Sequence, residues 1–160
     1  MNQITAKPPL EFVEALSASM EKILQFKGRS RRSEYWWTML AVILACFIVP
    51  PIGWLMRLAT IPLTFRRLHD SGRSGWWWGV GFILSIVLVG NIAYDLLTAY
   101  LNDGVGDEFP TFLVVKYLGL IGIVSLYEIV MLVLMCIDSQ VGFNKYGDSP
   151  KYPEADNRPL

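Results

Sequence analysis

Three long stretches of this 160-residue chain carry almost no charge, and this most limits what it can fold into. They are Tyr35–Met56, Trp76–Ala93 and Phe112–Ile137. Only Lys116 and Glu128 interrupt the third. A bilayer core requires about 20 apolar residues for each helical span, a length that the second and third stretches reach. The second stretch also lacks an amphipathic stripe with a side for water. The sequence therefore predicts a helical membrane protein rather than a soluble domain.

Composition and charge balance narrow the class further. Charged residues make up 18 % and apolar residues 53 % of the chain, against about 25 % and about 45–50 % in soluble domains. The 14 Lys and Arg side chains balance 14 Asp and Glu side chains, whereas a nucleic-acid-binding domain normally has a clear positive excess. We therefore expect neither a disordered chain nor a nucleic-acid partner. The length allows one membrane domain over residues 1–160.

The charged residues are sorted into blocks, and this predicts the orientation in the membrane. Lys and Arg are concentrated before the first apolar stretch and in residues 66–75, whereas residues 101–110 carry acids and no base. Short cytoplasmic loops are enriched in Lys and Arg. The N-terminus and the 66–75 loop are therefore expected in the cytoplasm and the 101–110 loop outside, and the C-terminus then returns to the cytoplasm.

In this topology residues 35–65 must start and end on the same side of the membrane. They number 31, too few for two full spans of about 20 residues each with a turn between them. Pro50 and Pro51 lie in the middle, where proline interrupts a helix. We expect a helical hairpin of Tyr35–Val49 and Ile52–Phe65, which either crosses a thin bilayer or is re-entrant.

The predicted fold class is all-α: a polytopic membrane bundle with four embedded segments, counting the hairpin as two. The full spans are expected at residues 76–98 and 112–137. A cytoplasmic tail at 138–160 is expected to be irregular and solvated, because it is rich in Gly, Pro, Asn and Asp. An amphipathic helix is expected at residues 10–25, either lying on the membrane interface or packing on the protein's own loops. Its apolar face carries Phe12, Leu16, Met20, Ile23 and Leu24.

Six arginines lie at the expected cytoplasmic boundary. They are Arg29, Arg31, Arg32, Arg66, Arg67 and Arg73. A guanidinium group can bind a phosphate with two hydrogen bonds. These residues therefore predict a basic face that contacts anionic membrane lipid or a protein partner, and the alternative is that they only set the topology.

Glu34, His69 and Asp70 form a second candidate group at the same boundary. His69 beside Asp70 suggests acid–base chemistry, but no nucleophile accompanies them, and catalysis needs a nucleophile, a base and an orienting group. We expect a structural polar cluster in which the acids pair with the arginines, and no enzyme activity. The two cysteines, Cys46 and Cys136, have no metal-ligand spacing, so no metal and no cofactor are expected.

Four ionisable residues are expected at membrane depth. Arg57 and Glu128 would lie about 12 Å and about 13 Å from the cytoplasmic side at 1.5 Å per residue, which suggests an ion pair. Asp95 and Lys116 lie near the outer ends of their helices, where Lys116 pairs or snorkels to the outer headgroups. Because charges at this depth are candidates for function, the alternative function is a small transporter or channel in which Arg57 and Glu128 line a polar path.

Small residues recur at helical spacing in the two full spans. This spacing suits the close crossing of membrane helices. The residues are Gly75, Gly79, Gly81 and Ser85 for the first span, and Gly119, Gly122 and Ser125 for the second. Such crossings occur within one bundle or between two copies of the chain, so a homo-oligomer stays open beside internal packing.

Three motifs together resemble a known family. They are Gly28-Arg29-x-x-Arg32-x-Glu34-Tyr35-Trp36, Arg66-Arg67-Leu68-His69-Asp70-x-Gly72-x-Ser74-Gly75-Trp76-Trp77 and Gly142-Phe143-Asn144-Lys145-Tyr146-Gly147-x-x-Pro150. The pattern is similar to that of the family named domain of unknown function 805, and the similarity extends over nearly the whole chain. The resemblance implies a small bacterial inner-membrane protein and implies no particular activity.

Overall fold

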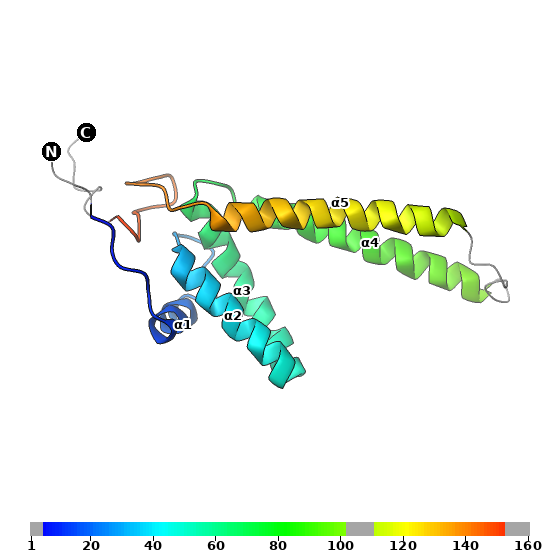
Figure 1. Ribbon diagram of the computed structural model, residues 1–160, viewed down its shortest axis with the longest axis horizontal. Helices are drawn as coiled ribbons and strands as arrows, with labels where there is room; N and C mark the ends of the chain where they lie inside the picture. Colours follow the sequence, from blue (N-terminus) through cyan, green and yellow to red (C-terminus); the bar gives the residue numbers. More distant parts are fainter. Residues whose placement is uncertain (1–4, 102–110, 153–160) are drawn as a thin grey trace. The chain divides into compact units, whose positions relative to one another are not determined.

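A computed structural model describes residues 5–101 and 111–152 (Figure 1). The described residues form five helices and no strand, with one isolated bridge between Asn144 and Gly147. The helices are α1 (Phe12–Glu21), α2 (Arg32–Ile48), α3 (Pro50–Asp70), α4 (Trp76–Leu101) and α5 (Thr111–Cys136). The predicted all-α class is confirmed for this part of the chain. The expected outer loop at 101–110 lies, apart from its first residue, outside the described residues.

The chain divides into two compact units, which are described separately. The first contains Met1–Trp77 together with Leu134–Leu160, and so includes α1, α2, α3 and the segment that follows α5. The second is Trp78–Val133, which comprises most of α4 and α5.

The first unit contains the expected helical hairpin, α2 followed at once by α3. The helices are separated by Val49 alone, and Pro50 and Pro51 occupy the first positions of α3, where a missing backbone N–H removes no helical hydrogen bond. The 17 and 21 residues of the two helices correspond to about 26 Å and about 32 Å. Crossing and re-entry of the bilayer by this hairpin both stay predictions.

A glycine allows the two helices of the hairpin to approach closely. Gly53 is buried, and a Cβ atom at this position would lie 2.4 Å from the Cα of Cys46. No side chain fits at such a distance, so Gly53 is required at the α2–α3 contact.

Helix α1 is shorter than the expected 10–25, and it packs on α2. A capping box of Glu11 and Glu14 sets its start. Ala15 is fully buried, and the hydroxyl groups of Ser19 and Thr38 are hydrogen bonded at 2.7 Å. One of the two expectations for this helix is that it packs on the protein's own loops. In the structure α1 packs on the helix α2 instead.

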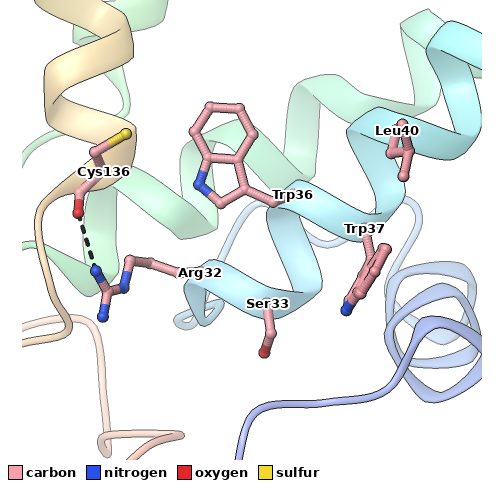
Figure 2. Close-up of a pocket in the computed structure, with 6 residues that line it drawn as sticks. All are labelled: Arg32, Ser33, Trp36, Trp37, Leu40 and Cys136. Carbon is pink, nitrogen blue, oxygen red and sulfur yellow. Dashed lines mark hydrogen bonds between the residues drawn. The ribbon is translucent and has the colours of Figure 1, made fainter.

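Side chains near the N-terminus of α2 form the wall of an open pocket. Arg32, Ser33, Trp36, Trp37 and Leu40 line this pocket, at the three- and four-residue spacing that places side chains on neighbouring faces of a helix. Cys136 completes the lining (Figure 2).

The second unit has the surface of a membrane hairpin. Its helices agree with the predicted spans of 76–98 and 112–137 to within three residues at each end. The most apolar stretch of α4 is 0 % buried and that of α5 is 11 % buried. A core helix of a soluble protein would be largely buried, so these exposed apolar surfaces are typical of helices that lie in lipid. Of the described helices, these two are long and apolar enough to span a bilayer.

We predict that Gly53→Ala lowers the free energy of unfolding by about 1–3 kcal/mol, because the added methyl group overpacks the α2–α3 contact. Gly90→Ala is the matched control, since a Cβ atom there meets nothing within 4 Å. The control is expected to be neutral or slightly stabilising. Both are measured by unfolding the full chain in mixed detergent micelles, and equal effects would contradict the close contact.

Candidate functional site

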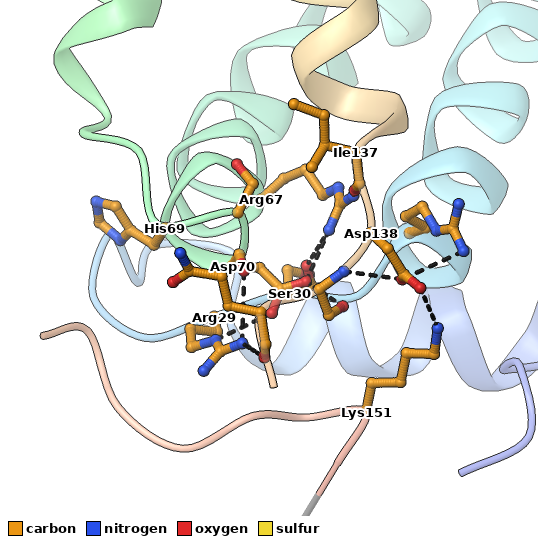
Figure 3. A network of polar contacts seen from close by, with 12 residues as sticks. Arg29, Ser30, Arg67, His69, Asp70, Ile137, Asp138 and Lys151 are labelled. Atoms are coloured by element: carbon orange, nitrogen blue, oxygen red, sulfur yellow. Dashed lines mark hydrogen bonds and ion pairs between the residues drawn. The ribbon is translucent and has the colours of Figure 1, made fainter. Parts of the chain in front are cut away.

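The first unit is organised around the carboxylate of Asp70, the last residue of α3. This side chain is fully buried and accepts a hydrogen bond from Arg29 Nε at 3.0 Å and one from Arg67 at 2.7 Å. Ser139 donates a third from its hydroxyl group. Figure 3 shows Arg29 in the loop before α2 and Arg67 with Asp70 at the end of α3, and Ser139 belongs to the segment after α5. We call Arg29, Arg67, Asp70 and Ser139 the Asp70 cluster.

The local sequence at the end of α3 explains why the cluster forms there. Arg67 and Asp70 are three residues apart and so face the same side of the last helical turn. Gly72 has a φ of 75°, which lets the chain reverse, and the Arg73 N–H returns to the Leu68 carbonyl. The carbonyl groups left open at this helix end are then available to other segments.

Arg29 uses its remaining donors to hold the segment after α5. It donates to the carbonyl oxygens of Gln140 and Gly142 at 2.5 Å and 2.7 Å, and to that of Gly147 at 3.2 Å. Asn144 adds a hydrogen bond to the His69 carbonyl at 3.0 Å. A single buried guanidinium group therefore fixes the path of residues 140–147.

Arg67 holds the end of α5 in the same way, by donating hydrogen bonds to backbone carbonyl groups. Its guanidinium group donates to the carbonyl oxygens of Met135 and Ile137. These carbonyls lie at a helix C-terminus, where partners inside the helix are lacking and a positive charge is favoured.

A second buried ion pair lies beside the Asp70 cluster. Arg66 contacts Glu34 at 3.3 Å and donates to the Lys22 carbonyl at 2.8 Å. Arg31 is also buried, and it donates to the carbonyls of Lys7 and Pro8. The acids Glu34 and Asp70 thus both pair with arginines inside the unit.

These positions correct the expected basic face. Arg29, Arg31, Arg66 and Arg67 are each less than 9 % exposed and bind this chain's own carbonyl and carboxylate groups. They do not face outward, because each guanidinium group finds acceptors in helix ends or irregular segments of the first unit. Of the six arginines, Arg32 and Arg73 are exposed.

The ring of His69 faces away from the Asp70 carboxylate. It stacks on Tyr146, with the ring centroids 3.7 Å apart and the planes at 8°, and its Nδ1 lies 3.2 Å from the Gly28 carbonyl oxygen. Burial lowers the pKa of His69 below its usual value, the contact with Gly28 opposes this shift, and Lys145 lowers the pKa further. The ring is therefore held neutral between a backbone group and an aromatic face.

A mixed surface lies beside the cluster, where Asp138 contacts Arg32 at 3.2 Å and Lys151 at 2.6 Å. Burial raises the pKa of Asp138. The hydrogen bonds from Lys151 and from the Ser139 N–H, with the charge of Arg32, outweigh burial, so the pKa lies below its usual value. Asp138 is therefore ionised at neutral pH.

In the second unit, two of the intramembrane charges pair directly. Lys116 Nζ lies 2.8 Å from Asp95 Oδ2, and the Tyr117 hydroxyl donates to the same oxygen. Arg57 is exposed on α3 in the first unit, and Glu128 is exposed on α5 in the second. Their pairing, and a polar path between them, stay predictions.

The role of the segment after α5 is not evident from the sequence. This segment is irregular, as expected, but Ser139 and Ser149 are buried rather than solvated. The signal was present in the third motif, since its Asn144, Tyr146 and Gly147 all contact the cluster or His69.

The fold and the buried polar cluster define a small helical integral membrane protein. The chain belongs to the family described as "Protein of unknown function (DUF805)", which matches residues 23–56 and 48–148. The resemblance stated from the three motifs is therefore confirmed. No solved structure matches the chain significantly.

Two relatives in Escherichia coli (strain K12) carry names that give a location. "Inner membrane protein YhaI" is 26 % identical over 148 residues, covering 83 % of this chain and 92 % of the relative. "Inner membrane protein YhaH" is 32 % identical over 77 residues, covering 36 % of this chain and 64 % of the relative. The chain thus spans less than two thirds of YhaH.

We predict that Asp70→Asn destabilises the protein by about 3–5 kcal/mol, because it leaves the guanidinium groups of Arg29 and Arg67 buried without a counter-charge. Asp138→Asn is the matched control. Its side chain is 45 % exposed, and exposed ion pairs contribute about 0–1 kcal/mol. Unfolding of both variants in mixed micelles tests this, and similar losses would contradict the central role of Asp70.

We predict that stability falls as the pH drops below the ordinary histidine pKa of 6.5. The folded protein holds His69 neutral, so the unfolded chain binds more protons there and acid favours unfolding. The chain contains one His. In the pH range between its folded and unfolded pKa values, His69→Gln should therefore make the free energy of unfolding less dependent on pH. The free energy of unfolding is measured against pH for the unsubstituted protein and for His69→Gln, and equal slopes would contradict the prediction.

Proposed function

We propose that the chain is a non-enzymatic inner-membrane protein with four embedded segments, whose cytoplasmic side rests on anionic lipid headgroups. The names of the Escherichia coli relatives support the location. The exposed apolar surfaces of α4 and α5 support membrane insertion. The sorted Lys and Arg residues support cytoplasmic termini.

The observation that carries the proposal is the exposed apolar face of α1. This helix uses Ala15 and Ser19 against α2 and leaves Val13 and Met20 exposed, with Leu24 just beyond its end. In water these side chains would form an unfavourable apolar surface. At a membrane interface the same face enters the boundary between headgroups and acyl chains.

Aromatic side chains near α1 also support the placement of this helix at the membrane interface. Trp37 packs edge-on against Phe12, with ring centroids 5.7 Å apart, and its indole N–H donates to the Leu10 carbonyl. Trp36 and Trp37 remain more than a third exposed. Tryptophan is enriched at the headgroup level of membranes.

The Lys and Arg side chains that are free to contact lipid headgroups differ from the six arginines that the sequence predicts for this face. Four arginines are engaged inside the first unit, so the contact is made by exposed residues outside the cluster. These are Lys22, Lys27, Arg32 and Arg73. The proposal includes no catalysis, because Asp70 and His69 are both engaged by internal groups.

The test is a depth measurement on the full chain in vesicles of phosphatidylglycerol and phosphatidylcholine. A fluorophore is attached at Met20→Cys in a background with Cys46→Ala and Cys136→Ala, and quenching by lipids with brominated chains is recorded. We expect strong quenching, since Met20 lies on the exposed apolar face. Glu21→Cys, the adjacent exposed residue on another face, is the control and should be quenched less.

Equal and weak quenching at both positions would overturn the proposal that α1 lies in the interface. Equal quenching in vesicles of phosphatidylcholine alone would retain the interface but remove the dependence on anionic lipid.

A further inference from the structure

Two adjoining pockets at the start of α2 differ in the types of residue that line them. The pocket in Figure 2, of about 460 Å³, has an apolar wall made of Trp36, Trp37 and Leu40. A second pocket, of about 230 Å³, is lined largely by charged and polar side chains. Both pockets share Arg32 and Ser33 in their lining, so one site has a polar half and an apolar half.

The polar half has an excess of positive charge. Four cationic residues line it: Lys7, Arg31, Arg32 and Lys151. Asp138 is the one acid in the lining, and it is shared between Arg32 and Lys151. In the part of the chain that the structure describes, Lys7 has no ion-pair partner. Among the described residues that line this pocket, cations therefore outnumber acids by four to one.

Arg32 lies between the polar half and the apolar half of the site, because it lines both pockets. It is the first residue of α2, and its side chain is 46 % exposed and bonds to the Cys136 carbonyl at 3.3 Å. The helix N-terminus adds a partial positive charge at this point. Trp36 and Leu40 follow Arg32 at four-residue spacing, so an apolar surface runs along α2 directly from the cation.

We propose that these pockets form one binding site for an anionic phospholipid. The phosphate occupies the polar half, with Lys7 and Arg32 as its main contacts, and an acyl chain lies against Trp36 and Leu40. This inference rests on the proposed function, which places the start of α2 at the headgroup level. Charge complementarity selects the anionic headgroup, and the apolar wall selects a lipid over a soluble phosphate.

The test is a titration of full-length protein in detergent with short-chain phosphatidylglycerol, with bound lipid counted by native mass spectrometry. We expect one tightly retained lipid per chain. Lys7→Gln with Arg32→Gln should weaken the affinity about tenfold, equivalent to about 1.4 kcal/mol. The matched control for Lys7→Gln alone is Lys145→Gln, which removes one charge from an exposed residue outside both pockets and should leave the affinity unchanged.

Further arms separate the parts of the proposal. Lys7→Gln alone tests the polar half without disturbing the contacts that Arg32 makes. Leu40→Asn should weaken lipid binding and leave any binding of glycerol phosphate unchanged. Equal retention of phosphatidylcholine would overturn the anionic headgroup, and glycerol phosphate binding as tightly as the lipid would overturn the acyl-chain contact.

The two proposals fail separately. Unchanged lipid retention in the Lys7 and Arg32 variants, together with strong quenching at Met20, overturns this site and leaves the interfacial helix in place. Absent quenching at Met20 overturns the proposed function whatever the lipid titration shows.

Discussion

The first unit depends on one carboxylate enclosed by two guanidinium groups. A buried charge costs several kcal/mol unless it is paired and hydrogen bonded, and Asp70 meets this condition through Arg29, Arg67 and Ser139. Two arginines against one aspartate leave a positive excess. Carbonyl oxygens at the end of α5 and in residues 140–147 accept hydrogen bonds from the two guanidinium groups. The backbone dipoles therefore stabilise the positive charge that Asp70 does not neutralise.

The two units are stabilised in different ways. In the first, buried arginines connect helix ends and loops, and the apolar core is small. In the second, apolar side chains face outward, and the polar contact of Lys116 with Asp95 lies on the inner side of a helical hairpin. The exposed leucine and isoleucine side chains of the second unit suit hydrocarbon rather than water.

The sequence predicts the helices better than it predicts the destinations of charged side chains. Apolar length alone predicts the two full spans, and the prolines at 50 and 51 predict the hairpin, since both are local properties. The burial of Arg29 is not local: the carbonyls that it binds in the tail lie 111 to 118 residues away. The motifs identified Arg29, Arg67 and Asp70 together, but the acceptors are backbone atoms, which leave no trace in residue type.

The long separation of these partners also sets an order of events during biosynthesis. Arg29, Arg67 and Asp70 leave the ribosome well before residues 135–147, and chains fold from the N-terminus as they emerge. Until the last helix is made, the two arginines lack the carbonyl groups that later enclose them, and water or lipid phosphate must solvate them. Completion of the first unit therefore waits for the synthesis of α5 and the residues after it, which then displace that solvent and connect the helices already in place.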